Sequence, residues 1–80
     1  MVNTELLEAK IKESGKSKSY LCRKLGITLQ TFRRKITNKV EFVLTEVERL
    51  CLELGIKSLS EKERIFFANI VDKNDNTKGE

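Results

Sequence analysis

The sequence contains no proline, no histidine and no tryptophan, and only two of its 80 residues are cysteine. Because histidine is missing and neither cysteine belongs to a Cys-x-x-Cys pair, the common ligand sets for zinc are missing too. The lack of histidine also removes the usual general base, so we expect neither an enzymatic activity nor a bound cofactor. No apolar run approaches the ~20 residues of a membrane span, and the chain is polar from Asn3, so we expect a cytoplasmic protein.

A chain of this length is sufficient for one domain. Few β-branched or aromatic residues alternate along it, and three of its four glycines follow amphipathic segments, where helices commonly end. The composition therefore favours short helices joined by tight turns. Cys22 and Cys51 both fall on apolar helical stripes, and we expect reduced core residues, with a disulfide as the alternative.

Amphipathic spacing and capping residues predict five helices, and hence an all-α fold. The predicted helices are Thr4–Ser14, Lys18–Leu25, a third that begins after Thr28 and ends near Asn38, a fourth from about Thr45 to Leu54, and a fifth that begins at Ser60. The buried stripe of the first helix is expected to contain Leu6, Leu7 and Ile11.

The fourth and fifth helices are each expected to begin with a capping box, Thr45-x-x-Glu48 and Ser60-x-x-Glu63. An extended connector over residues 40–44 precedes the fourth helix. We assign residues 1–71 to the domain and residues 72–80 to a disordered polar tail.

Positive charge is concentrated in one third of the chain. Between Ser14 and Val40 there is no acidic residue and there are eight basic ones, whereas the rest carries eight basic and twelve acidic residues. The net charge of +4 therefore separates into +8 in this window and −4 elsewhere. Such segregation is typical of a surface that binds a polyanion, although a charge run alone is equally compatible with a solvated face.

The second and third predicted helices are joined by Gly26-Ile27-Thr28, which is the spacing of a helix-turn-helix. The glycine allows a sharp reversal, the isoleucine fills the gap between the helices, and the threonine caps the third helix. The two helices are expected to pack through Leu21, Cys22, Leu25, Phe32 and Ile36. The opposite face of the third helix is then free to enter the major groove of DNA.

That free face carries side chains suited to base edges. Gln30 has the donor and acceptor that adenine requires, and Arg34, one turn later, can bind guanine in bidentate fashion. Leu29 fits either a thymine methyl group or the core. We expect base reading from Leu29, Gln30, Arg33 and Arg34, and phosphate contacts from Lys18, Ser19, Thr28, Thr31, Lys35, Asn38 and Lys39.

The run Leu-Cys-x-x-Leu-Gly-Ile-Thr-x-x-Thr-Phe-x-x-x-Ile, from Leu21 to Ile36, resembles the helix-turn-helix of lambda-repressor-like regulators of the Cro and Xre type. Cys22 stands where that family usually has alanine. In many Xre proteins the second buried residue of the recognition helix falls at the position of Lys35, whereas here Ile36 takes that role. Residues 28–34 are also similar to lac-repressor-type recognition helices.

The continuation over residues 38–42 and 66–68 resembles small phage-encoded Cro-like regulators of Gram-positive hosts. The resemblance covers about residues 4–71. It implies a five-helix domain that binds a double-stranded operator as a transcriptional repressor.

Two other functions stay open on the sequence. A protein-interaction module, such as an antirepressor or antitoxin, would use the same fold with its acidic half and its fifth helix as the working surface. An architectural or excision-type DNA binder would contact the backbone with little base reading. The fifth helix has a broad apolar face, so Phe66, Phe67 and Ile70 predict either a closed monomer core or a homodimer.

Overall fold

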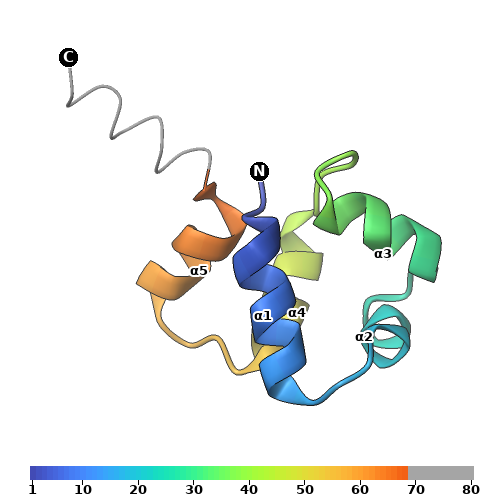
Figure 1. Ribbon diagram of the computed structural model, residues 1–80, viewed down its shortest axis with the longest axis horizontal. Helices are drawn as coiled ribbons and strands as arrows, with labels where there is room; N and C mark the ends of the chain where they lie inside the picture. The colour runs from blue at the N-terminus through green and yellow to red at the C-terminus, as the bar shows by residue number, and fades with distance from the viewer. Residues whose placement is uncertain (69–80) are drawn as a thin grey trace.

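The computed structural model describes residues 1–68, and these form five helices with no strand, which confirms the predicted all-α class (Figure 1). The helices are α1 (Thr4–Ser14), α2 (Lys18–Leu25), α3 (Leu29–Ile36), α4 (Leu44–Leu54) and α5 (Leu59–Phe66). The predicted boundary at residue 71, the tail and Ile70 lie outside the described residues.

The turn between α2 and α3 has the predicted construction. Gly26 adopts a left-handed φ of +74°, which costs little only for glycine. The amide groups of Gly26 and Ile27 donate to the Cys22 carbonyl at 2.8 and 3.1 Å, and Ile27 packs against the core. The hydroxyl of Thr28 accepts from the Thr31 amide at 3.1 Å, so α3 begins directly after the reversal.

The predicted capping box of α4 is wrong, and the helix begins at Leu44, one residue earlier than expected. The carboxylate that reaches back belongs to Glu46, which accepts from the Val43 amide at 3.0 Å. The same carboxylate binds Lys35 of α3. The start of α4 therefore has both a local hydrogen bond, from Val43 to Glu46, and a contact with α3, and the predicted box at Glu48 is not formed.

The predicted capping box of α5 is also wrong, because Ser58 caps this helix instead of Ser60. The Ser58 hydroxyl accepts from the Glu61 amide at 3.0 Å. Ser58-x-x-Glu61 offers the same capping pattern two residues earlier, and a salt bridge of 2.8 Å between Glu61 and Lys10 of α1 accompanies that start.

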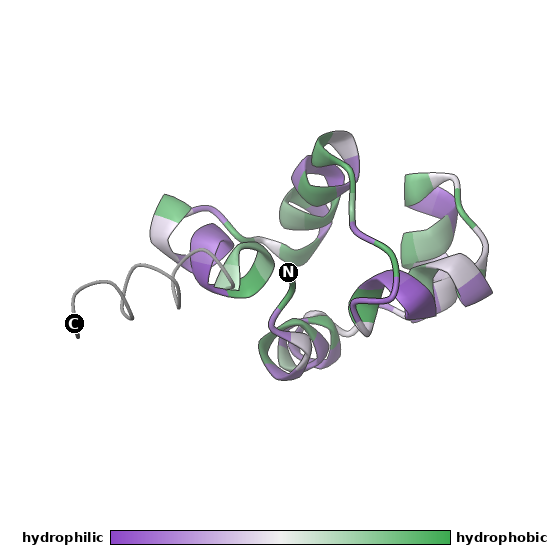
Figure 2. Ribbon diagram, turned by 90° about the horizontal axis from the view of Figure 1, so that it is seen from above, coloured by the Kyte–Doolittle hydropathy of each residue, from purple (hydrophilic) through white to green (hydrophobic). Residues whose placement is uncertain are grey.

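One core connects all five helices, and purple and green segments alternate around each helix in Figure 2, as amphipathic helices require. Its largest fully buried side chains are Phe32, Leu7, Leu21, Ile36 and Leu50. Both cysteines are buried and unpaired with each other, as expected. Leu6, expected in the buried stripe of α1, is instead 36% exposed, because the side of α1 that packs inward is centred on Leu7 and Ile11.

Phe66 belongs to the core of its own chain, which is one of the two alternatives that the sequence left open. It is 3% exposed, and its ring meets that of Phe42 edge-on at 5.9 Å between centroids. Phe42 in turn meets Phe32 of α3 at 6.2 Å. Phe67 is half-buried against the same core. This aromatic series joins the inner side of α3 to the end of α5.

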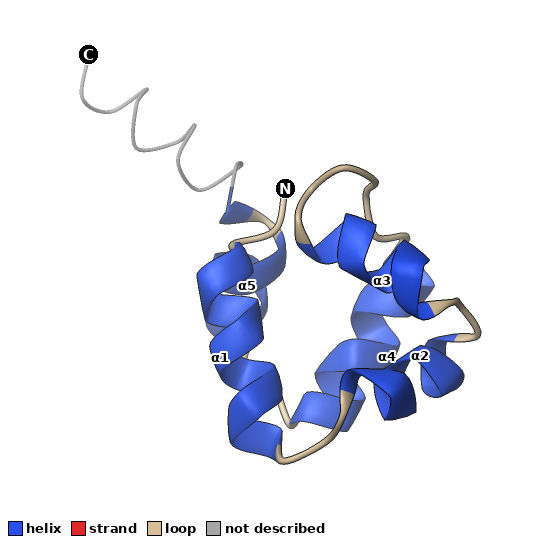
Figure 3. Cartoon of the chain, turned by 45° about the vertical axis from the view of Figure 1, so that its right-hand side comes forward, coloured by secondary structure: helices blue, strands red, loops and turns tan. Residues whose placement is uncertain are grey.

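The N-terminal residues connect the ends of α3 and α5 (Figure 3). The Asn3 amide donates to the Ile65 carbonyl at 2.7 Å. The side chain of Asn38, which follows α3 with a positive φ of +68°, accepts from the Val2 amide at 2.7 Å and donates to the Val2 carbonyl at 2.9 Å. Asn38 thus ends α3 in the left-handed conformation expected of it and also fixes that end in place.

Candidate nucleic-acid interface

The burial pattern of α3 defines which of its sides faces solvent. Phe32, Lys35 and Ile36 are buried. Because successive residues are about 100° apart around a helix, these three occupy one side, and Gln30 and Arg34 lie at the centre of the opposite side. Both of these side chains are exposed. Two of the four residues predicted to read bases, Gln30 and Arg34, therefore share one outward ridge.

Arg33 and Leu29 lie between this ridge and the buried side of α3. Arg33 is exposed, and its charge acts on Cys22 of α2: burial raises the pKa of the Cys22 thiol, and the guanidinium partly offsets that rise. Leu29 is half-buried and packs against the core. Of its two predicted roles, the structure supports the packing one.

Salt bridges divide the eight basic residues of the acid-free window into two groups. Three lysines bind carboxylates, in the pairs Lys16–Glu53 at 3.1 Å, Lys18–Glu8 at 3.0 Å and Lys35–Glu46 at 2.6 Å. The other five are exposed and have no carboxylate within 4.0 Å in the described part of the chain: Arg23, Lys24, Arg33, Arg34 and Lys39. Positive charge without a salt-bridge partner among the described residues is thereby left on α2, on α3 and on the loop that follows α3.

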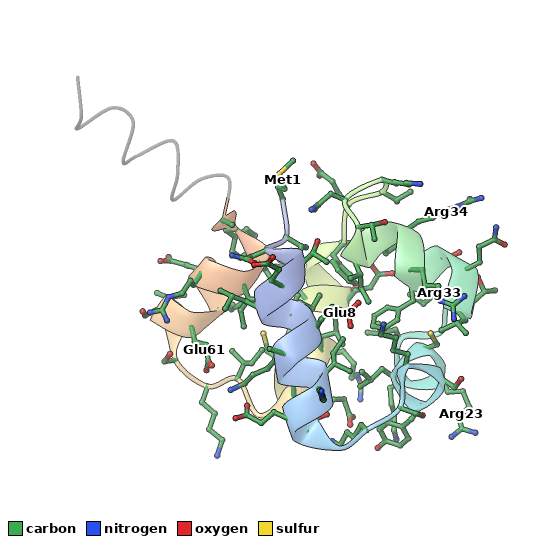
Figure 4. The ribbon with its side chains drawn as sticks, in the orientation of Figure 1. Met1, Glu8, Arg23, Arg33, Arg34 and Glu61 are labelled. Atoms are coloured by element: carbon green, nitrogen blue, oxygen red, sulfur yellow. The ribbon has the colours of Figure 1, made fainter. Side chains whose placement is uncertain are left out.

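The three arginines of this group lie on one side of the molecule. Figure 4 shows Arg23, Arg33 and Arg34 extending from α2 and α3, away from Glu61 on the opposite side. Arg23 was not among the predicted contacts. It is four residues after Ser19, so both lie on one ridge of α2, and this i, i+4 spacing from a predicted phosphate ligand was the signal available in the sequence.

The structure does not bring Lys35 to this surface, although phosphate contact was expected of it. Its side chain is 8% exposed, its ammonium donates to Glu46, and it lies 5.9 Å from the centroid of the Phe42 ring. Buried lysines occur almost only in such pairs. No local sequence pattern indicates this pair, because Glu46 is eleven residues away on another helix.

Four other predicted phosphate contacts make hydrogen bonds or an ion pair within the protein. Lys18 is half-buried and pairs with Glu8, and both polar groups of the Asn38 amide bind Val2. The Thr28 hydroxyl donates to the Thr31 hydroxyl at 2.9 Å and caps α3. The remaining two predicted phosphate contacts are exposed: Ser19, which precedes α3 in the sequence, and Lys39, which follows it.

No family model matches the sequence, and comparisons with characterised proteins and with solved structures return no match either. What distinguishes this surface is therefore its own geometry and charge. None of the five helices found in residues 1–68 combines the length and the hydrophobicity that a transmembrane span requires.

Proposed function

We propose that this protein binds double-stranded DNA sequence-specifically and regulates transcription in the manner of Cro-type repressors, with α3 in the major groove. One observation carries the proposal: Gln30 and Arg34 share the outward ridge of α3, beyond a tight turn, and Arg34 has no carboxylate partner among the described residues. Amide and guanidinium groups one turn apart match the bidentate edges of adenine and guanine.

The flanking charges suit the DNA backbone. Three exposed residues flank Gln30 and Arg34 in the sequence: Ser19 and Arg23 on α2, and Lys39 after α3. Cationic and hydroxyl groups at such positions orient a helix-turn-helix by contacting phosphates. Each phosphate that is neutralised releases counterions, so affinity should fall as salt is raised.

A mobility-shift titration tests this, using the full chain and a duplex that spans the region upstream of its own coding sequence. The plot of log affinity against log salt is expected to be linear, with a slope of about −0.9 for each phosphate contact. Lys39→Ala should weaken binding to all duplexes alike and reduce the slope by about one contact. Lys12→Ala removes another exposed lysine, on α1, and should change neither quantity.

The other outcomes identify the other functions. Equal, salt-sensitive affinity for every duplex would indicate an architectural DNA binder without base reading. The absence of any salt-sensitive binding would contradict DNA binding and favour a protein-interaction module such as an antirepressor or antitoxin.

A further inference from the structure

The last four carbonyl groups of α3 are all hydrogen-bonded, and one of them is bound by a distant part of the chain. A helix leaves these four groups without a partner inside the helix. Three of them accept backbone amides of residues 37–40, namely the carbonyls of Arg33, Arg34 and Lys35. The fourth, the carbonyl of Ile36, accepts the hydroxyl of Thr4 at 2.7 Å. Thr4 is the first residue of α1, so the end of α3 is completed by another helix.

Asn38, two residues after the end of α3, makes a second contact with the same part of the chain. Its side-chain amide binds both backbone groups of Val2, at 2.7 and 2.9 Å, and Val2 is buried. Four residues together form what we term the end anchor: Val2, Thr4, Ile36 and Asn38. Three hydrogen bonds therefore hold the end of α3 against the segment that leads into α1 (Figure 3).

The two residues of the outward ridge lie at opposite ends of α3. Gln30 is the second residue of the helix and follows directly on the Thr28 cap, whereas Arg34 belongs to the last turn, which the end anchor holds. The Arg34 carbonyl itself accepts the amides of Lys39 and Val40 at 2.8 and 3.3 Å. Since local bonds fix the first end of α3, a change in the end anchor should displace Arg34 and leave Gln30 in place.

We propose that Thr4 and Asn38 are positioning residues for base reading, and that through the end of α3 they set where the Arg34 guanidinium lies. This inference rests on the proposed function. A bidentate contact with guanine needs both hydrogen bonds at good length and angle, and binding groups have to be held within about 0.5 Å of such a geometry. The Lys35–Glu46 pair holds the inward side of the same turn against α4. The end anchor adds a second point of attachment, on another element, and so prevents the end of α3 from pivoting about that pair.

Base discrimination by Thr4→Val tests this inference. The substitution keeps the size of the side chain but removes the hydroxyl, so the Ile36 carbonyl loses its donor. Affinity is measured for the duplex that the unchanged chain prefers and for two altered duplexes. One is changed at the base pair whose preference Arg34→Ala abolishes, and the other at the base pair whose preference Gln30→Ala abolishes. Thr4→Val should lose about fivefold or more of the discrimination at the Arg34 base pair and less than about twofold at the Gln30 base pair.

Three further variants separate positioning from stability. Thr4→Ser restores the hydroxyl and should restore discrimination. Thr45→Val is the matched control and should change nothing, because it removes an exposed threonine hydroxyl near the start of α4, outside the end anchor. Asn38→Gly keeps the left-handed conformation but cannot bind Val2 through a side chain, so it should resemble Thr4→Val. A smaller folded fraction weakens binding to every duplex equally, so the ratio between duplexes is not affected by stability alone.

The end anchor is also measured without DNA. The backbone amides of residues 37–39 should have NMR order parameters of about 0.85 in the unchanged chain, and in Thr4→Val these should fall toward about 0.6, while the amide of Gln30 stays unchanged. Unchanged order parameters, equal losses at the two base pairs, or no rescue by Thr4→Ser would overturn this inference alone. An unchanged chain without any base preference would instead contradict the proposed function on which the inference rests.

Discussion

The ammonium of Lys35 lies 2.6 Å from a carboxylate oxygen of Glu46, and the two side chains are only 8% and 12% exposed. The same oxygen accepts the Val43 amide at the start of α4. One carboxylate therefore begins α4 and binds the inward side of α3. Since Lys35 faces inward, Gln30 and Arg34 face outward, and the pair helps to set which residues α3 presents.

Removing only the lysine of this pair should lower the free energy of unfolding more than removing both charges. Lys35→Met leaves a buried carboxylate without its cation, for which we expect a loss of about 3 kcal/mol. Lys35→Met combined with Glu46→Gln removes both charges and keeps an oxygen that accepts the Val43 amide, so most of the loss should be recovered. Urea unfolding of the single and double variants measures this. A double variant that is less stable than Lys35→Met would show that the pair is not the source of the cost.

The Asn38 amide and its backbone conformation should contribute separately to stability. Asn38→Gly keeps the left-handed φ of +68° but loses both bonds to Val2, at a cost of about 1–3 kcal/mol. Asn38→Ala also places a Cβ in that conformation, which adds about 1–2 kcal/mol. Thermal or urea unfolding should therefore rank the unchanged chain above the glycine variant and the glycine variant above the alanine variant. If glycine and alanine proved equal, the conformational contribution would be absent.

Acid should remove the contribution of Glu53 to stability. The hydrogen bond from Lys16, assisted by the Tyr20 hydroxyl, holds the pKa of the Glu53 carboxyl below its ordinary value despite partial burial. A carboxyl whose pKa is lower in the folded state stabilises above its unfolded pKa, and it loses that effect as the pH falls through the folded value. Glu53→Gln should therefore be less stable than the unchanged chain near pH 7, with the difference disappearing in acid. A difference that stays constant from neutral to acidic pH would contradict this origin.

The bounds of the first two helices and the start of the third could be predicted to the residue because they depend on neighbouring groups, whereas α3 ends at Ile36, two residues before the predicted Asn38. Ser17 and Thr28 cap α2 and α3 within three residues, and Gly26 supplies the left-handed turn. The starts of α4 and α5 could not be predicted in this way. Overlapping capping patterns compete there, and Glu46 and Glu61 each also bind a lysine on another helix.

The same distinction holds for the candidate site. The exposure of Gln30, Arg33 and Arg34 follows from the helical period alone, since Phe32 and Ile36 specify the inward side. Lys35 and Asn38 differ because their partners, Glu46 and Val2, lie eleven and 36 residues away in the sequence. Their polar groups are engaged by contacts that no local pattern reports.

Selection from a random duplex library, carried out in parallel with the unchanged chain, Gln30→Ala and Arg34→Ala, tests the central claim most directly. We expect the unchanged chain to enrich a defined motif. Each variant should lose preference at one position of that motif, adenine for Gln30 and guanine for Arg34, at about 1–3 kcal/mol of discrimination. Enrichment of no motif by the unchanged chain, or of an identical motif by all three proteins, would contradict base reading by the outward ridge of α3.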